Sequence, residues 1–558
     1  MQKHLIIKFI LLIILVSTQT NKLFAQVRSL DSNIVFSVGE YRATIADANK
    51  INENPAVIDS TQKLPVKSYS ISSQKINTGF DVAPIPAAQM VGEPLTKLYN
   101  ALVKIGYGNY NTPYGELWYN NLRSKEYSYG IHLRHFSSSP FLKNNDYGFP
   151  GFSDDNIGLY GKKFLKEHTL SGNFDYTGNR VHLYGYDANL QSLTKDATLQ
   201  RFNYFAGSAD LASHYSNDSK LNHDVNLSYY NLADIYKASE NNIKATGFVQ
   251  TKIDKEFLRI NGLVDYYNYK TAKDTFNDVM ISLNPNFIAS GEKYHASIGV
   301  TATMDKLEQT KYYFYPNVDI SYNVVENIII PYAGVNGGLH KNSFKTITNE
   351  NPFVLSALSM KNTNEKYTFY GGIKGNITNA VSYNARASYS SLANMAMYVN
   401  DTKDLLANRF NVIYDDAMEL NVRGEVGYQL REKIRFNLSG EYFNYKMATE
   451  MRAWYLPQVK VTLTGNYNIS DKIIIKADLF YLDNQYAKTI INPETPNPTV
   501  VATQLKPLFD ANLGGEYRYN KKLGFFVSIN NIASVRYYRY INYPTQRFNF
   551  MLGLSYSF

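Results

Sequence analysis

The chain has 558 residues, no cysteine and a formal net charge of +9 at pH 7. The lack of cysteine excludes disulfides, thiolate metal sites and a lipid anchor on an N-terminal cysteine. The basic residues are scattered along the chain, so the charge does not indicate nucleic-acid binding. Aromatic residues make up 14% of the chain, with 48 Tyr but only 2 Trp. This composition favours a membrane β-barrel with aromatic bands at both interfaces over a secreted β-sandwich or propeller.

The first 25 residues are expected to form a secretory signal peptide. Lys3 and Lys8 precede and enter an apolar run at 9–16, and Ala25 offers a small residue just before the expected cleavage point. The run is too short to span a bilayer, and no later segment approaches the roughly 18 consecutive apolar residues of a transmembrane helix. Cleavage removes three lysines and leaves a mature charge nearer +6, which is 9 minus 3.

Residues 26–96 form a second zone, which shows little strand alternation. We expect extended segments and turns here, with one short helix near 43–51. The zone is interpreted as a periplasmic or lumenal segment, either a reduced plug or a docking arm. Its prolines are Pro55, Pro65, Pro84, Pro86 and Pro94.

From Lys97 to Phe558 the chain consists of alternating runs of roughly ten residues, the length typical of barrel strands. Tight polar connectors occur near 124–126, 166–168, 217–219, 254–256, 291–293, 326–327, 378–379, 431–433, 470–472 and 520–522. Longer connectors occur at 137–155, 187–198, 341–365 and 483–504. Short turns on one rim and long loops on the other typify an outer-membrane barrel, with the short turns periplasmic. We therefore predict an all-β fold, a transmembrane antiparallel barrel of about 22 strands over 97–558.

The last eleven residues show the alternation most clearly. Their apolar face is predicted to meet lipid and the other face a wet lumen. The apolar face comprises Phe548, Phe550, Leu552, Leu554, Tyr556 and Phe558, and the other face comprises Asn549, Met551, Gly553, Ser555 and Ser557. Charges in runs 434–442 and 459–469 fall on the lumenal face, since Arg or Lys at mid-bilayer costs about 2–4 kcal/mol. The terminal Tyr556 and Phe558 resemble the signal read by the barrel assembly machinery.

Two stretches resemble TonB-dependent receptors. The residues from Asn530 to Pro544, which lead into the final strand, are similar to the last hairpin of that family. Residues 106–113 (GYGNYNTP) and 132–138 (HLRHFSS) resemble the first barrel strands of TonB-receptor-like proteins in the Bacteroidota. The resemblance implies an outer-membrane location and the binding or passage of a solute, with TonB as a partner.

The N-terminal zone departs from that family. The family's plug domain is nearly twice as long as 26–96, so energy-coupled import is in doubt. One segment resembles a TonB box, and the alternative for it is an ordinary edge strand or a periplasmic tail. This segment comprises Asp31, Ser32, Asn33, Ile34, Val35, Phe36, Ser37 and Val38.

We expect no catalytic residues, no cofactor and no metal site. The H-E-x-x-H, nucleophile-elbow and P-loop motifs are absent. Outer-membrane phospholipases use a Ser activated by a His on the lipid-facing wall, although such enzymes have far fewer strands. Strand alternation places His132 and Arg134 on one face and His135 on the other, and we interpret the group as lumen-lining polar residues over a metal site. Glu441 with Arg435, or Asp478 with Lys476, would contribute charge to the lumen wall.

The connector that begins at Lys341 contains the apolar run Pro352-Phe353-Val354-Leu355. It is either a loop that contacts a ligand or partner, or a cap folded over the barrel mouth.

The leading hypothesis is a TonB-dependent-receptor-like barrel that binds or passes a solute across the outer membrane without catalysis. The alternatives are a structural or interaction component of an outer-membrane assembly and a passive porin-like channel. Expected partners are outer-membrane lipid, the barrel assembly machinery, TonB, and a surface lipoprotein or other outer-membrane protein, but no nucleic acid.

Overall fold

A computed structural model describes residues 98–140, 147–188, 193–215, 220–401, 406–491 and 499–558. The expected signal peptide, the zone 26–96 and the box-like segment 31–38 lie outside these residues, so their interpretations stay predictions. The description below concerns the barrel that Tyr99–Phe558 forms by itself.

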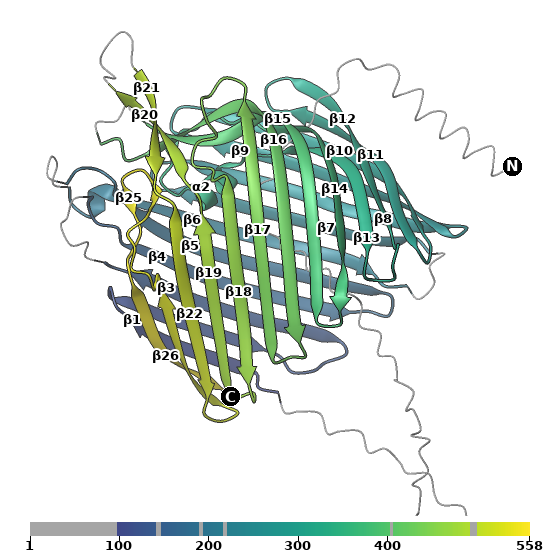
Figure 1. Cartoon of the computed structure of the whole chain (residues 1–558), viewed down its shortest axis with the longest axis horizontal. Helices are drawn as coiled ribbons and strands as arrows, with labels where there is room; N and C mark the ends of the chain where they lie inside the picture. The colour runs from purple at the N-terminus through teal and green to yellow at the C-terminus, as the bar shows by residue number, and fades with distance from the viewer. Residues whose placement is uncertain (1–97, 141–146, 189–192, 216–219, 402–405, 492–498) are drawn as a thin grey trace, which may run out of the picture. The chain divides into compact units, whose positions relative to one another are not determined.

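A closed sheet of 22 antiparallel strands makes up this barrel (Figure 1). Each strand pairs with the next barrel strand along the chain, and β1 closes the ring by pairing with β26. The strands are β1 (Ala101–Gly108), β2 (Thr112–Asn120), β3 (Tyr127–Ser138), β4 (Phe152–Phe164), β5 (His168–His182), β6 (Leu199–Ser213), β7 (Asn222–Asp234), β8 (Ser239–Ile253), β9 (Glu256–Lys270), β10 (Thr275–Ser290), β11 (Tyr294–Lys306), β12 (Thr310–Tyr322), β13 (Ile330–His340), β14 (Thr363–Thr378), β15 (Val381–Asn400), β16 (Phe410–Leu430), β17 (Ile434–Met447), β18 (Val459–Ile469), β19 (Ile473–Leu482), β22 (Leu508–Arg518), β23 (Leu523–Asn530) and β26 (Asn549–Ser557). The predicted fold class is confirmed.

The remaining elements belong to the loops. The β13–β14 loop contains the helix α2 (Phe344–Glu350), and the β5–β6 loop contains a 3-10 turn, Asp196–Thr198. The β19–β22 loop contains a hairpin, β20 (Gln485–Ile491) and β21 (Thr499–Leu505). The β23–β26 loop contains β24 (Tyr538–Tyr540) and β25 (Tyr543–Pro544). Among the described residues, no helix is both long and apolar enough to cross a membrane.

The two rims differ as the sequence predicted. β1 begins and β26 ends at one rim, where the amide N–H groups of Ala101 and Phe558 each donate to the other's carbonyl at 3.0 Å. The predicted tight turns that fall on described residues all lie at this rim, and the turn at 217–219 lies outside the described residues. Asp254 and Asp471 sit in these turns with φ near 60°, a conformation that Asp and Asn tolerate better than other side chains.

The long connectors lie at the opposite rim, with two corrections to their bounds. Ser137 and Asp155 belong to strands β3 and β4, so that loop is shorter than expected. The connector 483–504 contains the β20–β21 hairpin, whose alternation the sequence reading had assigned to loop.

The outer wall is apolar where the terminal pattern predicted it. Leu552 is 57% exposed and Leu554 is 42% exposed, whereas their neighbours Met551 and Gly553 face inward. At Gly553 the Phe526 ring lies 2.2 Å from where a Cβ would be. The lumenal glycine therefore makes room for an aromatic ring inside the barrel.

Candidate functional site

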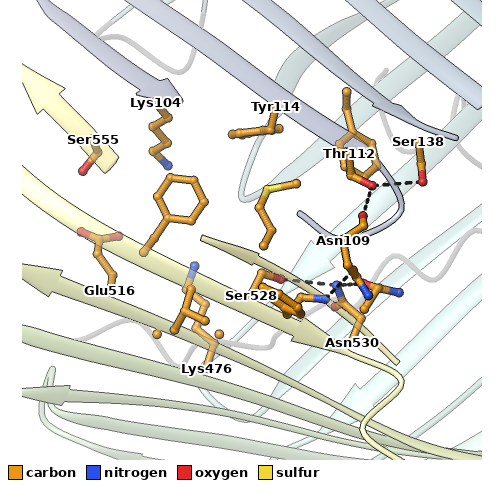
Figure 2. A pocket seen from close by; sticks show the side chains of 18 of the residues that line it. Lys104, Asn109, Thr112, Tyr114, Ser138, Lys476, Glu516, Ser528, Asn530 and Ser555 are labelled. Carbon is orange, nitrogen blue, oxygen red and sulfur yellow. Dashed lines mark hydrogen bonds between the residues drawn. The ribbon is translucent and has the colours of Figure 1, made fainter. Parts of the chain in front are cut away.

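The lumen wall near the β1–β26 seam carries charged and polar side chains beside apolar ones. A cavity of about 410 Å³ opens there, between β1–β3 and the last strands of the barrel (Figure 2). Lys104, Arg134 and Lys476 line it together with Glu516. Lys104 and Arg134 pair with acids on neighbouring strands, Glu116 at 3.9 Å and Asp154 at 3.0 Å, so the charges on this stretch of wall are largely balanced.

A hydrogen-bond network around one carboxylate connects side chains on the neighbouring stretch of wall. Glu116 on β2 accepts a hydrogen bond from the Tyr114 hydroxyl at 2.7 Å and lies 3.0 Å from His132 Nε2. The His132 ring stacks on Trp118 with centroids 3.6 Å apart. His132 is therefore a satisfied lumenal side chain, as the interpretation of a polar lumen lining predicted.

The wide mouth of the barrel is covered from within by the loop between β13 and β14. Its helix α2 starts at the cap Ser343, whose hydroxyl accepts from Thr346 N–H, a typical N-cap. Phe344 and Ile347 on α2 are fully or almost fully buried. The Phe344 ring stacks on Tyr269 of β9 with centroids 5.2 Å apart. Hydrophobic burial thus fixes α2 to the inner wall.

The apolar run after α2 crosses toward the opposite loops. Val354 is 2% exposed, and the Phe353 ring lies 4.1 Å from the ring of Tyr543 in β25. Leu355 N–H donates to the Phe410 carbonyl at 2.8 Å, and Phe410 N–H donates to the Phe353 carbonyl at 3.0 Å. Of the two arrangements that the sequence left open for this loop, the structure shows the cap.

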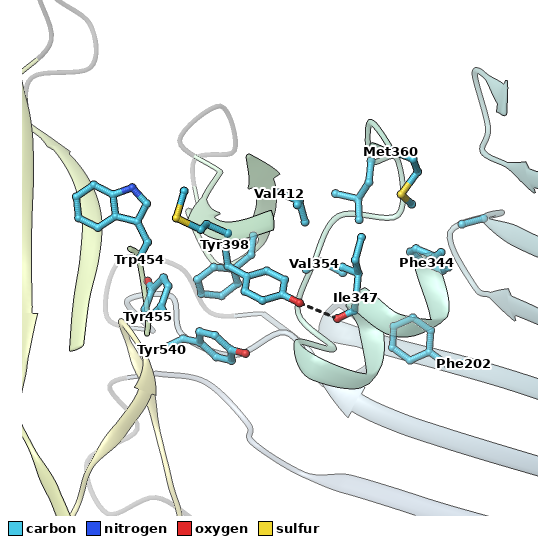
Figure 3. Packing of buried hydrophobic residues seen from close by; sticks show 14 of the residues in the cluster. Phe202, Phe344, Ile347, Val354, Met360, Tyr398, Val412, Trp454, Tyr455 and Tyr540 are labelled. Atoms are coloured by element: carbon cyan, nitrogen blue, oxygen red, sulfur yellow. Dashed lines mark hydrogen bonds between the residues drawn. The ribbon is translucent and has the colours of Figure 1, made fainter. Parts of the chain in front are cut away.

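Residues from several loops and strand ends complete a single hydrophobic cluster over the lumen, which we call the roof (Figure 3). Trp454 and Tyr455 come from the β17–β18 loop and Tyr540 from β24, and all three are buried. The roof comprises Phe344, Ile347, Val354, Leu358, Met360, Tyr398, Phe410, Val412, Trp454, Tyr455, Tyr540 and Tyr543, with Val181, Phe202, Tyr267 and Tyr269 from the wall. It ties segments that are far apart in sequence into one closure.

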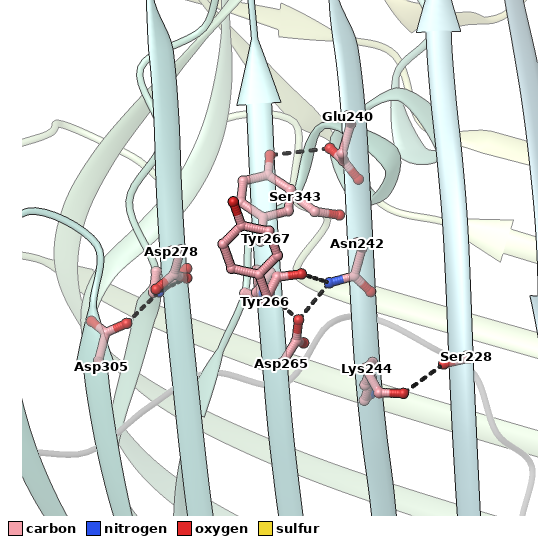
Figure 4. Close-up of polar contacts among 12 residues, drawn as sticks. Ser228, Glu240, Asn242, Lys244, Asp265, Tyr266, Tyr267, Asp278, Asp305 and Ser343 are labelled. Atoms are coloured by element: carbon pink, nitrogen blue, oxygen red, sulfur yellow. Dashed lines mark hydrogen bonds and ion pairs between the residues drawn. The ribbon is translucent and has the colours of Figure 1, made fainter.

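Polar contacts anchor both ends of α2. At its start, the carboxylate of Glu240 on β8 accepts from Lys345 N–H at 3.1 Å and from the Tyr267 hydroxyl at 3.0 Å (Figure 4). At its end, Glu350 Oε2 accepts from the Tyr398 hydroxyl at 2.9 Å. These bonds satisfy backbone and side-chain groups that burial would otherwise leave unpaired.

Burial shifts the pKa values of two ionisable side chains on α2. Desolvation raises the pKa of the Glu350 carboxyl, and the Tyr398 hydrogen bond and the cation of Arg539 offset this only in part. Desolvation likewise lowers the pKa of the Lys345 ammonium. Lys345 Nζ donates to the Tyr204 hydroxyl at 2.6 Å. The roof thus contains ionisable groups whose charged forms oppose burial.

The remaining predicted residues fall as follows. His135 points to the outer face beside Asp155, opposite to His132, as strand alternation predicted. Glu441 forms an ion pair with Arg423 at 2.8 Å. Lys476 lines the lumenal cavity. Over the described ranges, no group of three His, Asp or Glu side chains is placed to hold a metal.

The sequence patterns do not predict most of the roof. Tyr398 and Phe410 lie at strand ends, and Trp454 lies in a loop without a recognisable motif. The Tyr-rich segment 537–543, part of the predicted last hairpin, supplies Tyr540 and Tyr543. The available sign in the sequence was the presence of aromatic residues beyond the expected strand ends, which indicates packing between loops.

A closed barrel of 22 antiparallel strands, with an apolar outer band and a polar lumen, is the architecture of an outer-membrane β-barrel protein. The protein is located in the outer membrane.

No family model matches the sequence, and no curated protein matches it. Solved structures share the fold. The FrpB iron transporter from Neisseria meningitidis aligns with a TM-score of 0.64 at 10% identity, over 83% of this chain and 82% of that one. The pyoverdine outer membrane receptor FpvA from Pseudomonas aeruginosa gives 0.62 at 12% identity, over 83% and 79%. The siderophore receptor PiuA from Acinetobacter baumannii gives 0.59 at 11%, over 83% and 82%.

Proposed function

We propose that this protein binds a solute at the cell surface and admits it through the barrel lumen, without chemistry on the solute. The observation that carries the proposal is the roof, a packed hydrophobic closure over a polar, charged lumen. Buried aromatic residues across the mouth would block conduction, so a passive pore does not need them. A gated receptor needs such an element, because the closure must be stable until a ligand shifts it.

The N-terminal zone 26–96 would close the lumen from the periplasmic side or serve as a docking arm. This fits the resemblance to TonB-dependent receptors of the Bacteroidota type, with a plug shorter than the family's. Segment 31–38 would be the contact for TonB. The fold shared with an iron transporter and two siderophore receptors supports the receptor class, while the solute of this chain is left open.

Conductance in a planar lipid bilayer tests the gate. The variants are the full barrel, a barrel in which residues 344–359 are replaced by a short Gly-Ser linker, a barrel that lacks residues 26–96, and a barrel with both changes. We expect no steady current from the full barrel, and open-pore currents when the roof loop and the N-terminal zone are both removed. Steady current from the full barrel would instead identify a passive channel.

Uptake experiments test the energy coupling. Deleting residues 31–38 should abolish growth on the transported solute to the same extent as deleting TonB. If the roofless barrel still carries no current and neither deletion affects uptake of any solute tested, the protein is a structural component that holds an outer-membrane assembly together. A surface lipoprotein recovered with the intact barrel would then be its partner.

A further inference from the structure

The outer face of β3 and β4 carries a serine, a histidine and an aspartate in hydrogen-bonded order. His135 Nδ1 lies 2.6 Å from Asp155 Oδ1, and His135 Nε2 lies 3.1 Å from Ser137 Oγ. His135 and Asp155 are register partners across the two strands, and Ser137 follows His135 by two residues on the same face. Nucleophilic catalysis requires this order, in which a base contacts the nucleophile and a carboxylate orients the base.

The carboxylate is itself held in place. Ser153, two residues before Asp155 on β4, donates its hydroxyl to Asp155 Oδ2 at 3.0 Å. One carboxylate oxygen therefore faces the imidazole while the other is fixed by a neighbour. This arrangement keeps the Nδ1–H tautomer of His135 and directs Nε2 at Ser137.

Strand alternation places the three residues outside the barrel, at the outer end of its lipid-facing band. Leu133 and Ile157, next on the same face, are 36% and 40% exposed. β3 ends at Ser138 on the long-loop rim, one residue beyond Ser137. The three residues thus lie where hydrocarbon gives way to headgroups, the depth at which lipid ester linkages lie.

A bound lipid would have access to the imidazole. His135 is 48% exposed. Its register partner on β2 is Gly115, and nothing lies within 4 Å of where a Cβ would be at that glycine. Arg180, the register partner of Ser153 on β5, is exposed in the same row and supplies a cation on that face.

We propose that Ser137, His135 and Asp155 form an esterase site that cleaves an ester-linked acyl chain of an outer-leaflet lipid. Ser137 Oγ attacks the ester carbonyl while His135 Nε2 takes the hydroxyl proton. The ester C–O bond breaks, and His135 returns that proton to the leaving alcohol, which leaves an acyl group on Ser137. A water molecule then attacks this acyl group with His135 as base, releasing the fatty acid and restoring the serine. Arg180 is assigned to the developing oxyanion.

This site does not depend on the proposed solute passage, because none of its side chains reaches the lumen. A barrel that conducts nothing can still have the esterase, and a receptor without it can still transport. The two proposals therefore fail separately.

Covalent labelling of the folded barrel in detergent micelles tests the nucleophile. A fluorophosphonate probe should label the full chain, and Ser137→Ala should abolish labelling. Ser128→Ala is the matched control, since it removes a hydroxyl from the opposite, lumenal face of the same strand, near its other end. We expect Ser128→Ala to keep labelling within a few-fold. No labelling of the full chain, or equal labelling of Ser137→Ala, would overturn the proposal. Heat-dependent gel mobility checks that each variant is folded.

Hydrolysis assays identify the lipid. Mixed micelles containing either a phospholipid with a labelled acyl chain or lipid A are incubated with each variant. Release of fatty acid from one of them should fall by at least about a hundredfold in Ser137→Ala and His135→Ala, as in other serine hydrolases. The lipid that is cleaved identifies the source of the ester. If neither lipid is cleaved, the proposed activity is rejected.

Asp155 acts as a positioning residue through His135. Asp155→Asn should therefore lower kcat while KM stays within about twofold, because the carboxylate contacts the base and not the lipid. A parallel rise in KM with unchanged kcat would contradict this role.

Discussion

Glu350 shows how one buried carboxylate can make the roof sensitive to pH. Its folded pKa is raised by desolvation, so the folded roof binds a proton more readily than the loosened loop does. Stability contributed by this group is present at low pH and is lost as pH rises from the ordinary Glu pKa of about 4.3 through the raised value. Lys345, whose pKa is lowered by desolvation, acts in the opposite direction, because the stability that it contributes increases as pH rises.

We therefore expect the roof to loosen as pH rises through the mildly acidic range. Open-channel events of a barrel lacking 26–96 should become more frequent, because ionised Glu350 is poorly solvated in the cluster. Glu350→Gln mimics the protonated acid and can still accept the Tyr398 hydrogen bond, so its gating should be independent of pH in this range. A pH response of equal size in Glu350→Gln would assign the effect to another group.

A second residue-scale prediction concerns the two faces of the last strand. Leu554 faces lipid near the middle of β26, while Ser555 faces the lumenal cavity. Leu554→Arg should destabilise the barrel by about 2–4 kcal/mol, because it exposes a charge to hydrocarbon. Ser555→Arg, one residue along, should cost much less. Unfolding by guanidinium in lipid vesicles measures both, and equal losses would refute the assigned faces.

At the scale of elements, α2 and the run that follows it hold the roof shut. Phe344 is fully buried between α2 and the wall, so Phe344→Ala should weaken the docking of the loop by about 3–5 kcal/mol. The expected result is faster proteolysis within 344–360 and brief channel openings. Met451→Ala is the control, since Met451 is 65% exposed in a loop beside the cluster. Unchanged protection in Phe344→Ala would show that other loops alone secure the closure.

For the whole molecule, closure of the ring rests on the pairing of β1 with β26. Lys104 and Ser555 are direct register partners across this seam, and the chain has no cysteine of its own. The double substitution Lys104→Cys and Ser555→Cys should form a disulfide on mild oxidation, because opposed residues lie about 4.5–5.5 Å apart. Lys104→Cys with Met551→Cys, which lies four residues before Ser555 on β26 and opposite Gly108, should not. Gel mobility of the boiled, non-reduced protein distinguishes the two double variants. Cross-linking in both variants would show that the register between β1 and β26 is not fixed.

The barrel could be predicted from the alternation along the chain. A period of two with one apolar face, as in Phe550 and Leu552 against Met551 and Gly553, is a local property that lipid on one side and water on the other impose on every strand. Polar turns such as the one at Asp254 are local too, so strand number and rim assignment followed from counting them. The opposite orientations of His132 and His135 were predicted for the same reason.

The residues that fill the mouth, and those that meet across neighbouring strands of the wall, are known only from the three-dimensional structure. The roof joins Val354, Tyr398, Trp454 and Tyr540, which no periodicity connects, because their contacts arise between loops brought together by ring closure. The placement of Asp155 against His135 likewise depends on the register between β3 and β4, which the alternation of either strand alone leaves free. Local patterns fix the faces of strands, whereas contacts between strands and loops depend on how the ring closes.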